Sequence, residues 1–349
     1  MYNFKNDYTE GAHPNILQKL IETNLSQQNG YGEDEYSIEA KKIIKQHIQN
    51  EKASIYFVSG GTQTNLLIIS ALLQLHEAVI SAQTGHIYAH ETGAIEALGH
   101  RIITIESMDG KITPSAIEQV LKAYSMRPHV VKPKLVYISN STEIGTLYSK
   151  SELADLYAFC LQHSLYLFMD GARLGHALTA GNNDLTLADI AQLTDVFYIG
   201  GTKNGALLGE AIVFNNPSLV PDFDYIIKQK GALLAKGRVL GIQFLELFKD
   251  NLYFDLAAHA NKMAMKITQA MEANGYSFLT YSTTNQLFPI LPKSLIQKLK
   301  EKYLFLEWKE INEDYSAIRI ITSWATNEHI IDEFINDIKQ LKVLITKTI

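Results

Sequence analysis

The stretch that decides the fold is Leu165-Tyr166-Leu167-Phe168-Met169-Asp170-Gly171-Ala172-Arg173. Its apolar run leads into an aspartate and a small-residue turn, which is typical of a buried strand that ends at a site. A second run, Val196-Phe197-Tyr198-Ile199-Gly200-Gly201-Thr202, ends at Lys203. A pyridoxal phosphate enzyme needs a carboxylate under the pyridine nitrogen and an amine in the Schiff base. Asp170 and Lys203 are therefore candidates for those two groups.

Short apolar runs of this kind recur between about residue 53 and residue 213 and alternate with amphipathic helical patterns. The predicted strands are 54–58, 78–80, 101–105, 134–139, 165–169, 196–199 and 211–214. The predicted helices between them include 64–75, 115–124 and 149–163. This alternation predicts an α/β fold with a mainly parallel seven-stranded sheet that is covered on both faces. A ligand site is then expected at the carboxyl ends of the strands.

After residue 214 the pattern changes. Residues 237–274 are predicted to form one long helix, or two helices in series that are broken near Asp250-Asn251. Beyond them, we expect strands at 278–281 and 286–290, a helix at 294–303, strands at 304–310 and 318–323, and a helix at 327–341. The sequence therefore predicts a large cofactor-binding domain with an N-terminal arm (residues 1–244) and a small C-terminal α+β domain (residues 245–349).

The composition narrows the class of protein. The chain has 349 residues, of which 46% are hydrophobic and 19% charged, and its net charge of −6 does not suit a nucleic-acid surface. Its single cysteine, Cys160, lies in a helical apolar pattern and is expected to be buried. No signal-peptide core is present, and no stretch reaches the ~18 apolar residues of a membrane span. These features predict a cytoplasmic protein that binds neither nucleic acid nor a membrane.

Ordinary interpretations exist for the candidate residues. Most lysines are solvated, but Lys203 ends a predicted strand, and an amine in a partly dry pocket is a better nucleophile. Asp170 could instead cap a helix or bind a metal, although no second carboxylate stands at ligand spacing. Arg173 could be a surface charge, or it could reach the phenolate side of the cofactor or a substrate carboxylate.

A possible phosphate-binding turn, Ser59-Gly60-Gly61-Thr62-Gln63-Thr64-Asn65, follows a predicted strand and opens a helix. The N–H groups of Gly61 and Thr62 at such a helix N-terminus could bind a phosphate dianion. The alternative is a tight turn in which Thr62 or Thr64 caps the helix. The segment matches neither a P-loop nor Gly-x-Gly-x-x-Gly, so it indicates phosphate only together with the other motifs.

His86 follows the next predicted strand, in Gly85-His86-Ile87-Tyr88-Ala89-His90-Glu91. It could be structural, or it could stack on the pyridine ring and act as a base or position one. A metal set of His86, His90 and Glu91 is also conceivable, with the last two residues on the following helix. The phosphate turn and Lys203 favour the cofactor chemistry, so no metal is expected.

Taken in order, these motifs resemble those of the low-specificity L-threonine aldolases. These enzymes belong to the β-eliminating lyase group, which depends on pyridoxal phosphate and has the aspartate aminotransferase fold. The resemblance extends from Asn6 to Arg319. It implies that Lys203 forms the Schiff base, that Asp170 pairs with the pyridine nitrogen and that His86 stacks on the ring. It also implies that the phosphate is bound by Gly61 and Thr62.

The resemblance implies further site residues and an assembly. Arg319 would hold the substrate carboxylate with the help of Asn6, and Thr142 would also lie in the substrate site. Tyr31, in Tyr31-Gly32-Glu33-Asp34, resembles a residue that reaches the site of a neighbouring subunit. Lys230 and Arg238 lie in a stretch that approaches the cofactor across that interface. Such shared sites imply a homo-oligomer, typically a tetramer built as a dimer of dimers.

The chain departs from this family in one motif. Many members carry Asn-Thr-His where this chain has Ser139-Asn140-Ser141-Thr142-Glu143. The missing histidine is often proposed to contact the substrate β-hydroxyl, so its absence leaves His86 or a water as the candidate base. The variant is similar to the branch that includes phenylserine aldolases.

The activity that the resemblance implies is retro-aldol cleavage of β-hydroxy-L-amino acids. L-Threonine or L-allo-threonine would give glycine and acetaldehyde, and related aryl substrates would react in the same way. β-Elimination or transamination on the same fold is the nearest alternative, because Lys203 and Asp170 serve all of these reactions. A more distant alternative is a binding protein that keeps the fold but has no catalytic activity.

Overall fold

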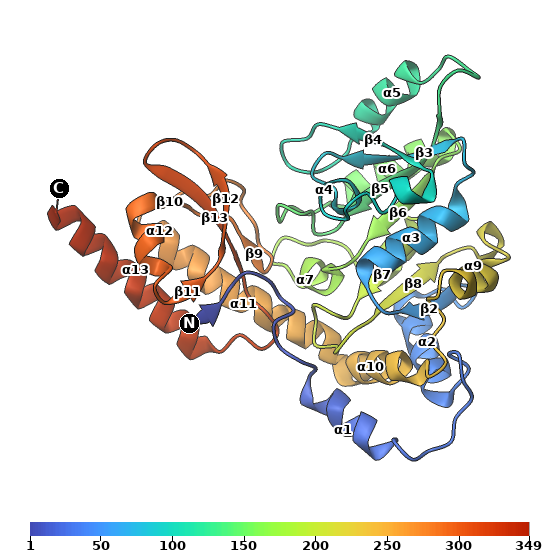
Figure 1. Cartoon of the computed structure of the whole chain (residues 1–349), viewed down its shortest axis with the longest axis horizontal. Coiled ribbons are helices and arrows are strands. Elements are labelled where there is room, and N and C mark those ends of the chain that lie inside the picture. The colour runs from blue at the N-terminus through green and yellow to red at the C-terminus, as the bar shows by residue number, and fades with distance from the viewer. Residues whose placement is uncertain (349) are drawn as a thin grey trace.

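The structure is a computed structural model that describes the backbone of residues 1–348 and the side chains of residues 1–342. Its main feature is a seven-stranded sheet with the strand order β2-β8-β7-β6-β5-β3-β4 (Figure 1). The strands are β2 (Ser54–Val58), β3 (Glu77–Ala82), β4 (Arg101–Ile105), β5 (Lys132–Ser139), β6 (Tyr166–Asp170), β7 (Val196–Gly200) and β8 (Glu210–Phe214). Only β8 runs antiparallel to its neighbours in this sheet, so the predicted mainly parallel sheet is confirmed.

Helices cover both faces of the sheet (Figure 1). They are α1 (Pro14–Glu22), α2 (Glu35–Ile48), α3 (Gly61–Leu72), α4 (His86–Ala89), α5 (Pro114–Ala123), α6 (Lys150–Gln162), α7 (Leu174–Leu178), α8 (Leu187–Gln192), α9 (Phe223–Gln229) and α10 (Arg238–Phe248). Short 3-10 helices are η1 (Glu96–Leu98) and η2 (Pro217–Leu219). All residues of β3, β7 and β8 are buried, as expected for strands covered on both faces. Cys160 is buried in α6, as predicted.

A second part of the chain follows the predicted helix break. Helix α10 ends at Phe248, η3 (Lys249–Asn251) follows, and α11 (Leu252–Ala273) continues. The break is confirmed at Asp250 and Asn251, which have φ values of 51° and 66°. Beyond α11 lie β9 (Gln286–Leu287), β10 (Ile290–Pro292), α12 (Lys293–Leu299), β11 (Tyr303–Leu304), β12 (Leu306–Glu310), β13 (Tyr315–Ile321) and α13 (Glu328–Thr348). Strand β13 pairs with β9, β10 and β12, and α11, α12 and α13 pack beside them.

Two predictions in this part were wrong. Residues 278–281 do not form a strand, because only an isolated bridge joins Phe278 to Pro289. The helix predicted over 294–303 ends at Leu299, because Tyr303 and Leu304 form β11. β11 pairs in parallel with β1 (Tyr2–Asn3), and such a partner from the start of the chain leaves no trace in the local pattern.

The N-terminal segment therefore lies against the C-terminal elements, as Figure 1 shows for the blue first strand. Phe4 is fully buried, and its ring lies 5.9 Å from that of Tyr303 and 5.2 Å from that of Phe334. The chain then continues through α1 and α2 to β2, the first strand of the large sheet. The division into residues 1–244 and 245–349 stays a prediction.

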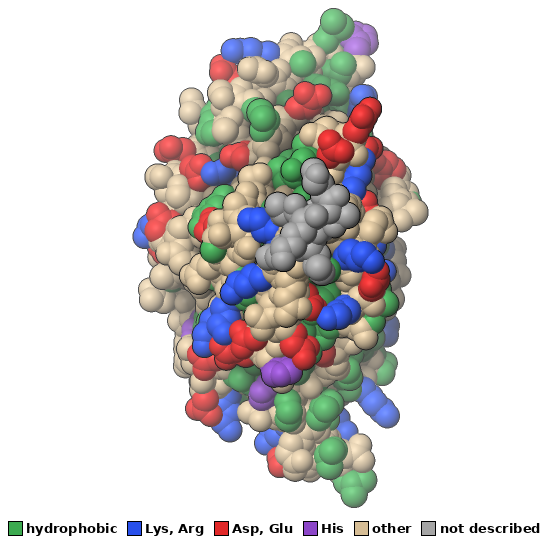
Figure 2. Space-filling model, turned by 90° about the vertical axis from the view of Figure 1, so that its left-hand side faces the viewer, with side chains coloured by type: hydrophobic (Ala, Val, Ile, Leu, Met, Phe, Trp, Pro, Cys, Tyr) green, Lys and Arg blue, Asp and Glu red, His purple; other side chains and the backbone are tan. Residues whose placement is uncertain are grey.

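The surface carries charges of both signs. On the face in Figure 2, basic and acidic side chains are interspersed, and neither sign forms a continuous area. Over residues 1–348, we find no helix with the length and apolar character that a membrane span requires.

Candidate active site

Asp170 ends β6, and its carboxylate accepts four hydrogen bonds. The hydroxyl of Tyr137 donates to Oδ2 and that of Tyr198 to Oδ1, both at 2.6 Å. The N–H of Ala172 lies 3.0 Å from Oδ1, and Nδ2 of Asn65 lies 3.4 Å from Oδ2. Burial and the charge of Asp170 raise the pKa of both tyrosines well above the usual range, so they remain donors. These four donors orient the carboxylate and stabilise its negative charge.

Lys203 follows β7 at the same edge of the sheet. Its side chain is partly buried, and no described residue forms a hydrogen bond or an ion pair with its amine. Burial and the nearby positive charge of Arg173 lower the pKa of Lys203, and the charges of Asp7 and Asp170 oppose that shift. An amine with a lowered pKa and no fixed partner is suited to attack an aldehyde.

Glu210 is a buried carboxyl group beside this amine that the sequence analysis missed. It opens β8, opposite Gly200, and its Oε2 accepts the N–H of Gly201 at 3.1 Å. Burial raises the pKa of Glu210 to about 8, and the charge of Lys203 acts in the opposite direction. An acidic residue at the head of the apolar run 211–214 was the signal that could have indicated it.

The predicted phosphate turn forms the start of α3. Gly60 is extended, and no side chain caps the helix, so the alternative of a Thr62 or Thr64 cap is wrong. Instead, the hydroxyl of Thr64 donates to the carbonyl of Gly60. The N–H groups of Gly61 and Thr62 have no backbone or side-chain acceptor within residues 1–348. A Cβ atom on Gly61 would lie 3.2 Å from the Tyr198 hydroxyl, so the turn adjoins the group that binds Asp170.

His86 belongs to the same hydrogen-bond network. Its Nδ1 lies 2.9 Å from Oε1 of Glu91, whose carboxylate is inaccessible to solvent. The same Oε1 accepts a hydrogen bond of 2.7 Å from Nδ2 of Asn65, the amide that also reaches Asp170. Helix α4 ends at Ala89, so His90 and Glu91 lie beyond it and not on a following helix, contrary to the prediction. Within the described residues, no cluster of three His, Cys, Asp or Glu side chains could hold a metal ion.

Arg173 pairs with Asp7, a residue that the sequence analysis did not single out. Nε and an Nη atom of Arg173 donate to the Asp7 carboxylate at 2.7 and 3.0 Å. Asp7 is fully buried and also accepts a hydrogen bond from Nδ2 of Asn285. Burial alone would raise the pKa of Asp7, but Arg173 and Lys203 hold it far below its usual range. The N-terminal segment thereby forms one wall of the site.

Arg319, on β13, has a guanidinium that is not satisfied within the chain. Its Nε is buried and has no hydrogen-bond partner, and one Nη atom lies 3.4 Å from the carbonyl oxygen of Lys5. The guanidinium lies 4.9 Å from the centre of the Trp308 ring. Burial and the charge of Arg173 lower its pKa to about 10. Buried donors are normally paired, so this free Nε indicates a place for an anionic ligand.

For Asn6 and Thr142, the side-chain hydrogen bonds in the structure are local and do not indicate a ligand. Oδ1 of Asn6 accepts the N–H of Tyr8, in the segment beside Arg319. Thr142 is buried, and its hydroxyl lies 2.7 Å from that of Thr146 within one turn. Its role as a substrate ligand stays a prediction.

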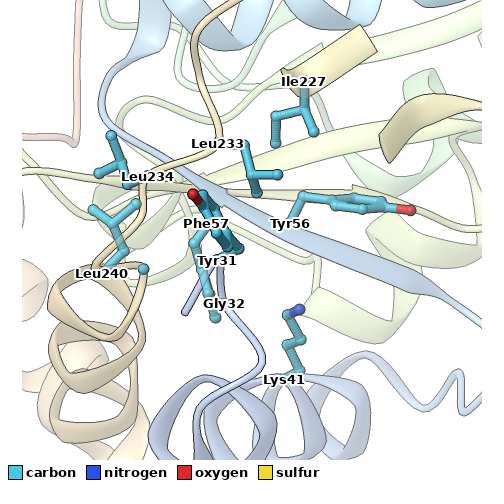
Figure 3. Close-up of a pocket in the computed structure, with 10 residues that line it drawn as sticks. Tyr31, Gly32, Lys41, Tyr56, Phe57, Ile227, Leu233, Leu234 and Leu240 are labelled. Carbon is cyan, nitrogen blue, oxygen red and sulfur yellow. The ribbon is translucent and has the colours of Figure 1, made fainter. Parts of the chain in front are cut away.

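Tyr31, Lys230 and Arg238 lie in a separate region. Tyr31 lies in a pocket formed with Lys41, Tyr56, Phe57, Ile227 and Leu233 (Figure 3). Its ring lies 4.5 Å from Nζ of Lys228, and its N–H donates to the carbonyl of Ala235. Arg238 donates to the backbone carbonyls of Thr23, Asn24 and Ser26, and Lys230 is exposed. No described contact joins these residues to Asp170 or Lys203, so within one copy they do not complete the site.

The remaining residues fit a pyridoxal phosphate molecule. The unpartnered amine of Lys203, the open N-terminus of α3 and the fixed carboxylate of Asp170 occur together. The hydroxyl of Tyr198 binds the carboxylate and lies beside the helix N-terminus. A profile of the β-eliminating lyases matches residues 4–293.

The chain belongs to the β-eliminating lyase family. Pyridoxal phosphate is the cofactor of this family, as predicted. The low-specificity L-threonine aldolase of Pseudomonas aeruginosa is 31% identical in an alignment of 345 positions that covers 96% of each chain. A threonine aldolase structure from Leishmania major is 48% identical and has a TM-score of 0.96 over 98% of this chain and 99% of that chain. An aspartate aminotransferase of Thermus thermophilus, 12% identical, has a TM-score of 0.71 over 97% of this chain and 90% of its own, which confirms the fold.

A buried histidine behind this lyase site gives a prediction on stability. His176 is fully buried, neither ring nitrogen has a partner among the described residues, and burial lowers its pKa to about 4. Its stability contribution is therefore present above the usual pKa of 6.5 and is lost as the pH falls towards 4. The free energy of unfolding should fall between pH 7 and pH 4 in both proteins, and we expect this fall to be about 3 kcal/mol smaller in His176→Leu than in the wild type. Urea unfolding of both proteins at pH 7 and pH 4 measures this fall. An equal fall in His176→Leu and in the wild type would contradict the prediction.

Proposed function

We propose that this chain catalyses the retro-aldol cleavage of β-hydroxy-L-amino acids, with L-threonine or L-allo-threonine giving glycine and acetaldehyde. The observation that carries the proposal is the combination of three groups, two at the carboxyl edge of the large sheet and one on β13 that is close enough to feel the charges of Arg173 and Asp7. They are the Lys203 amine, the Asp170 carboxylate with its two tyrosine donors, and the free buried Nε of Arg319. The threonine aldolase relatives favour this reaction over β-elimination and transamination on the same fold.

The predicted site residues take the following roles in the proposal. Bound pyridoxal phosphate supplies an electron sink for the negative charge that is left at Cα when a bond to it breaks. Lys203 would hold its aldehyde carbon, Asp170 its ring nitrogen, and the N-terminus of α3 its phosphate. His86 would lie against the ring. Arg173 would be a further contact from this chain, and Lys230 and Arg238 contacts from a neighbouring copy.

Asp170 and Arg319 act on different parts of the reacting system. The carboxylate of Asp170, oriented by Tyr137 and Tyr198, would hold the ring nitrogen of the cofactor and favour a proton on it. The guanidinium of Arg319 binds the substrate carboxylate, with Asn6 beside it. Holding the carboxylate fixes the orientation of the other bonds at Cα, and that orientation selects the bond that breaks.

The experiment that tests this function measures products from the purified chain with added pyridoxal phosphate. Glycine and acetaldehyde from L-threonine or L-allo-threonine would support the proposal. Phenylserine, assayed as glycine and benzaldehyde, would show whether aryl substrates react. Pyruvate and ammonia from serine, without aldol cleavage, would favour β-elimination instead. If the chain never gains visible absorbance with pyridoxal phosphate, this result would favour the alternative of a binding protein without catalytic activity.

Arg319→Gln is expected to lower kcat/KM for L-threonine about 10- to 100-fold, mainly through a higher KM. The substitution removes the charge-assisted hydrogen bonds to the substrate carboxylate. Arg319→Lys keeps the charge but not the planar fork, so an intermediate loss is expected. Steady-state kinetics of the three proteins measure this. A KM unchanged in both variants would remove Arg319 from the substrate site.

We propose that the chain is a cytoplasmic homo-oligomer, a tetramer built as a dimer of dimers. Exposed apolar side chains on and after α1 support an interface: Ile21 is 70% exposed, Leu25 92% and Tyr31 50%. Hydrophobic side chains also lie at the lower end of Figure 2, the end at which Figure 1 places α1. Light scattering on the purified protein measures the assembly, and a monomer with full activity would contradict the proposal of shared sites.

A further inference from the structure

Retro-aldol cleavage requires a group that accepts the proton of the substrate β-hydroxyl. This inference rests on the proposed function and concerns the identity of that group. A suitable acceptor must lie at the carboxyl edge of the sheet and must offer an atom that is not already hydrogen-bonded. The other acidic groups at the site are either engaged in hydrogen bonds or closed to solvent.

Asp170 accepts four hydrogen bonds, and Asp7 is engaged by Arg173 and Asn285. Glu91 has one oxygen, Oε2, without a hydrogen-bond partner among the described residues, but its carboxylate is inaccessible to solvent and its Oε1 is shared by His86 and Asn65. Asp170 and Asp7 cannot approach a substrate hydroxyl without losing partners, and a substrate hydroxyl cannot reach Glu91, because its carboxylate is closed to solvent. Glu210 is buried behind the turn that carries Lys203. The carboxylate that remains is Glu143.

Glu143 follows β5, the strand between those that lead to His86 and to Asp170. Its Oε1 accepts a hydrogen bond of 2.6 Å from the hydroxyl of Ser139 and one of 3.0 Å from the backbone N–H of His86. Both bonds go to the same oxygen, so Oε2 has no hydrogen-bond donor from any other described residue. The carboxylate is thus held firmly by one oxygen and offers the other.

The surroundings of Glu143 also make it a stronger base than an exposed carboxylate. Burial raises its pKa, the negative charge of Asp170 adds to that effect, and the Ser139 hydrogen bond and His86 oppose it. The charge of Glu143 in turn acts on Arg173 and on Tyr137, so it faces the interior of the site. A general base is most effective when its pKa lies close to the working pH.

We propose that Glu143 is the catalytic base that accepts the β-hydroxyl proton, through its Oε2 atom. In this step the O–H bond breaks and its proton joins Oε2, while its electron pair forms the carbonyl bond of the aldehyde. The Cα–Cβ bond breaks, and its electron pair stays with the glycine fragment. One proton then joins Cα and one leaves Glu143, so the step is balanced without a further reactant.

The test compares Glu143→Gln with the wild-type holoenzyme in two assays. Glutamine can keep both hydrogen bonds of Oε1, but it replaces Oε2 with an amide nitrogen that accepts no proton. Cleavage of L-threonine is expected to fall about 100-fold or more. Exchange of the glycine Cα proton in heavy water involves no hydroxyl group, so it is expected to fall less than about fivefold. Glu106→Gln, at an exposed residue after β4, is the matched control and should change neither rate.

Two further measurements separate a base from a structural residue. Visible titration with pyridoxal phosphate and the thermal midpoint should be the same for Glu143→Gln as for the wild type. Glu143→Asp should recover part of the cleavage rate, because it restores a carboxylate. The fall in cleavage at acidic pH, expected for the wild type as Glu143 is protonated, should be absent in Glu143→Gln.

Three outcomes would overturn the inference: equal losses in both assays, no loss in either, or loss of cofactor binding in the variant. Retained cleavage in Glu143→Gln together with its loss in His86→Asn would identify His86 as the base instead. The proposed function fails separately, if the wild type exchanges the glycine proton but cleaves no β-hydroxy amino acid.

Discussion

Lys203→Ala is expected to lower the rate of L-threonine cleavage by about 10⁴-fold or more. In the proposed function its unpartnered amine is the nucleophile at the carboxyl edge of the sheet, and its pKa is lowered by burial and by Arg173. No other described lysine occupies this edge, so no neighbour can replace it. Product assays with saturating pyridoxal phosphate measure the change, and visible absorbance shows whether the cofactor still binds.

A lysine away from the site provides the control for this prediction. Lys262, exposed on α11, can be changed to alanine and should leave both the rate and the absorbance unaltered. The thermal midpoint of the cofactor-free Lys203→Ala protein should change little, because the amine forms no hydrogen bond to a described residue and its removal therefore breaks none. A Lys203→Ala protein that cleaves threonine at a near-normal rate would refute the assignment of this residue.

The second large effect is expected for Asp170→Asn, about 10²- to 10⁴-fold in kcat. Asparagine removes the negative charge and turns one acceptor atom into a donor. That donor would face the hydroxyl of Tyr137 or Tyr198, each 2.6 Å away in the wild type. The charge that favours a proton on the ring nitrogen would be lost together with the geometry. Kinetics at several cofactor concentrations separate loss of rate from loss of binding.

Phenylalanine variants of the two tyrosines show how much of that effect belongs to the hydrogen bonds. Tyr137→Phe and Tyr198→Phe each remove one donor and leave the carboxylate charged. We expect losses of about 10-fold, in line with one buried hydrogen bond to a charged group. If either variant lost as much as Asp170→Asn, the charge of Asp170 would not be the decisive property.

Much of the large sheet could be predicted from the sequence. Strands β2 and β4 have the predicted bounds, and the other strands of that sheet start and end within two residues of the prediction. Fully buried strands are short apolar runs, and their lengths are set by the turns that follow, so the local pattern contains the necessary information. Asp170 and Lys203 were singled out as candidates for the same reason, because each ends such a run.

The partners of these residues could not be predicted in this way. Tyr137 and Tyr198 were counted as apolar members of their strands, although their hydroxyls bind Asp170. Glu91 and Asn65 meet across 26 residues, and Asp7 meets Arg173 across 166. Such contacts depend on the order of strands in the sheet and on the path of the N-terminal segment. Periodicity reports burial, but it does not report which buried groups meet.

The pairing of β1 with β11 has a consequence for synthesis on the ribosome. The partners of Tyr2 and Asn3, which are Tyr303 and Leu304, are made about 300 residues after them. Asp7 likewise waits for Asn285 before its burial is complete. Residues 2–7 must therefore stay undocked while the large sheet forms, which leaves their apolar side chains open to chaperones or to wrong contacts. The hydrogen bonds that join Asp7 to Arg173 and Asn285 can all form only after Asn285 has been translated.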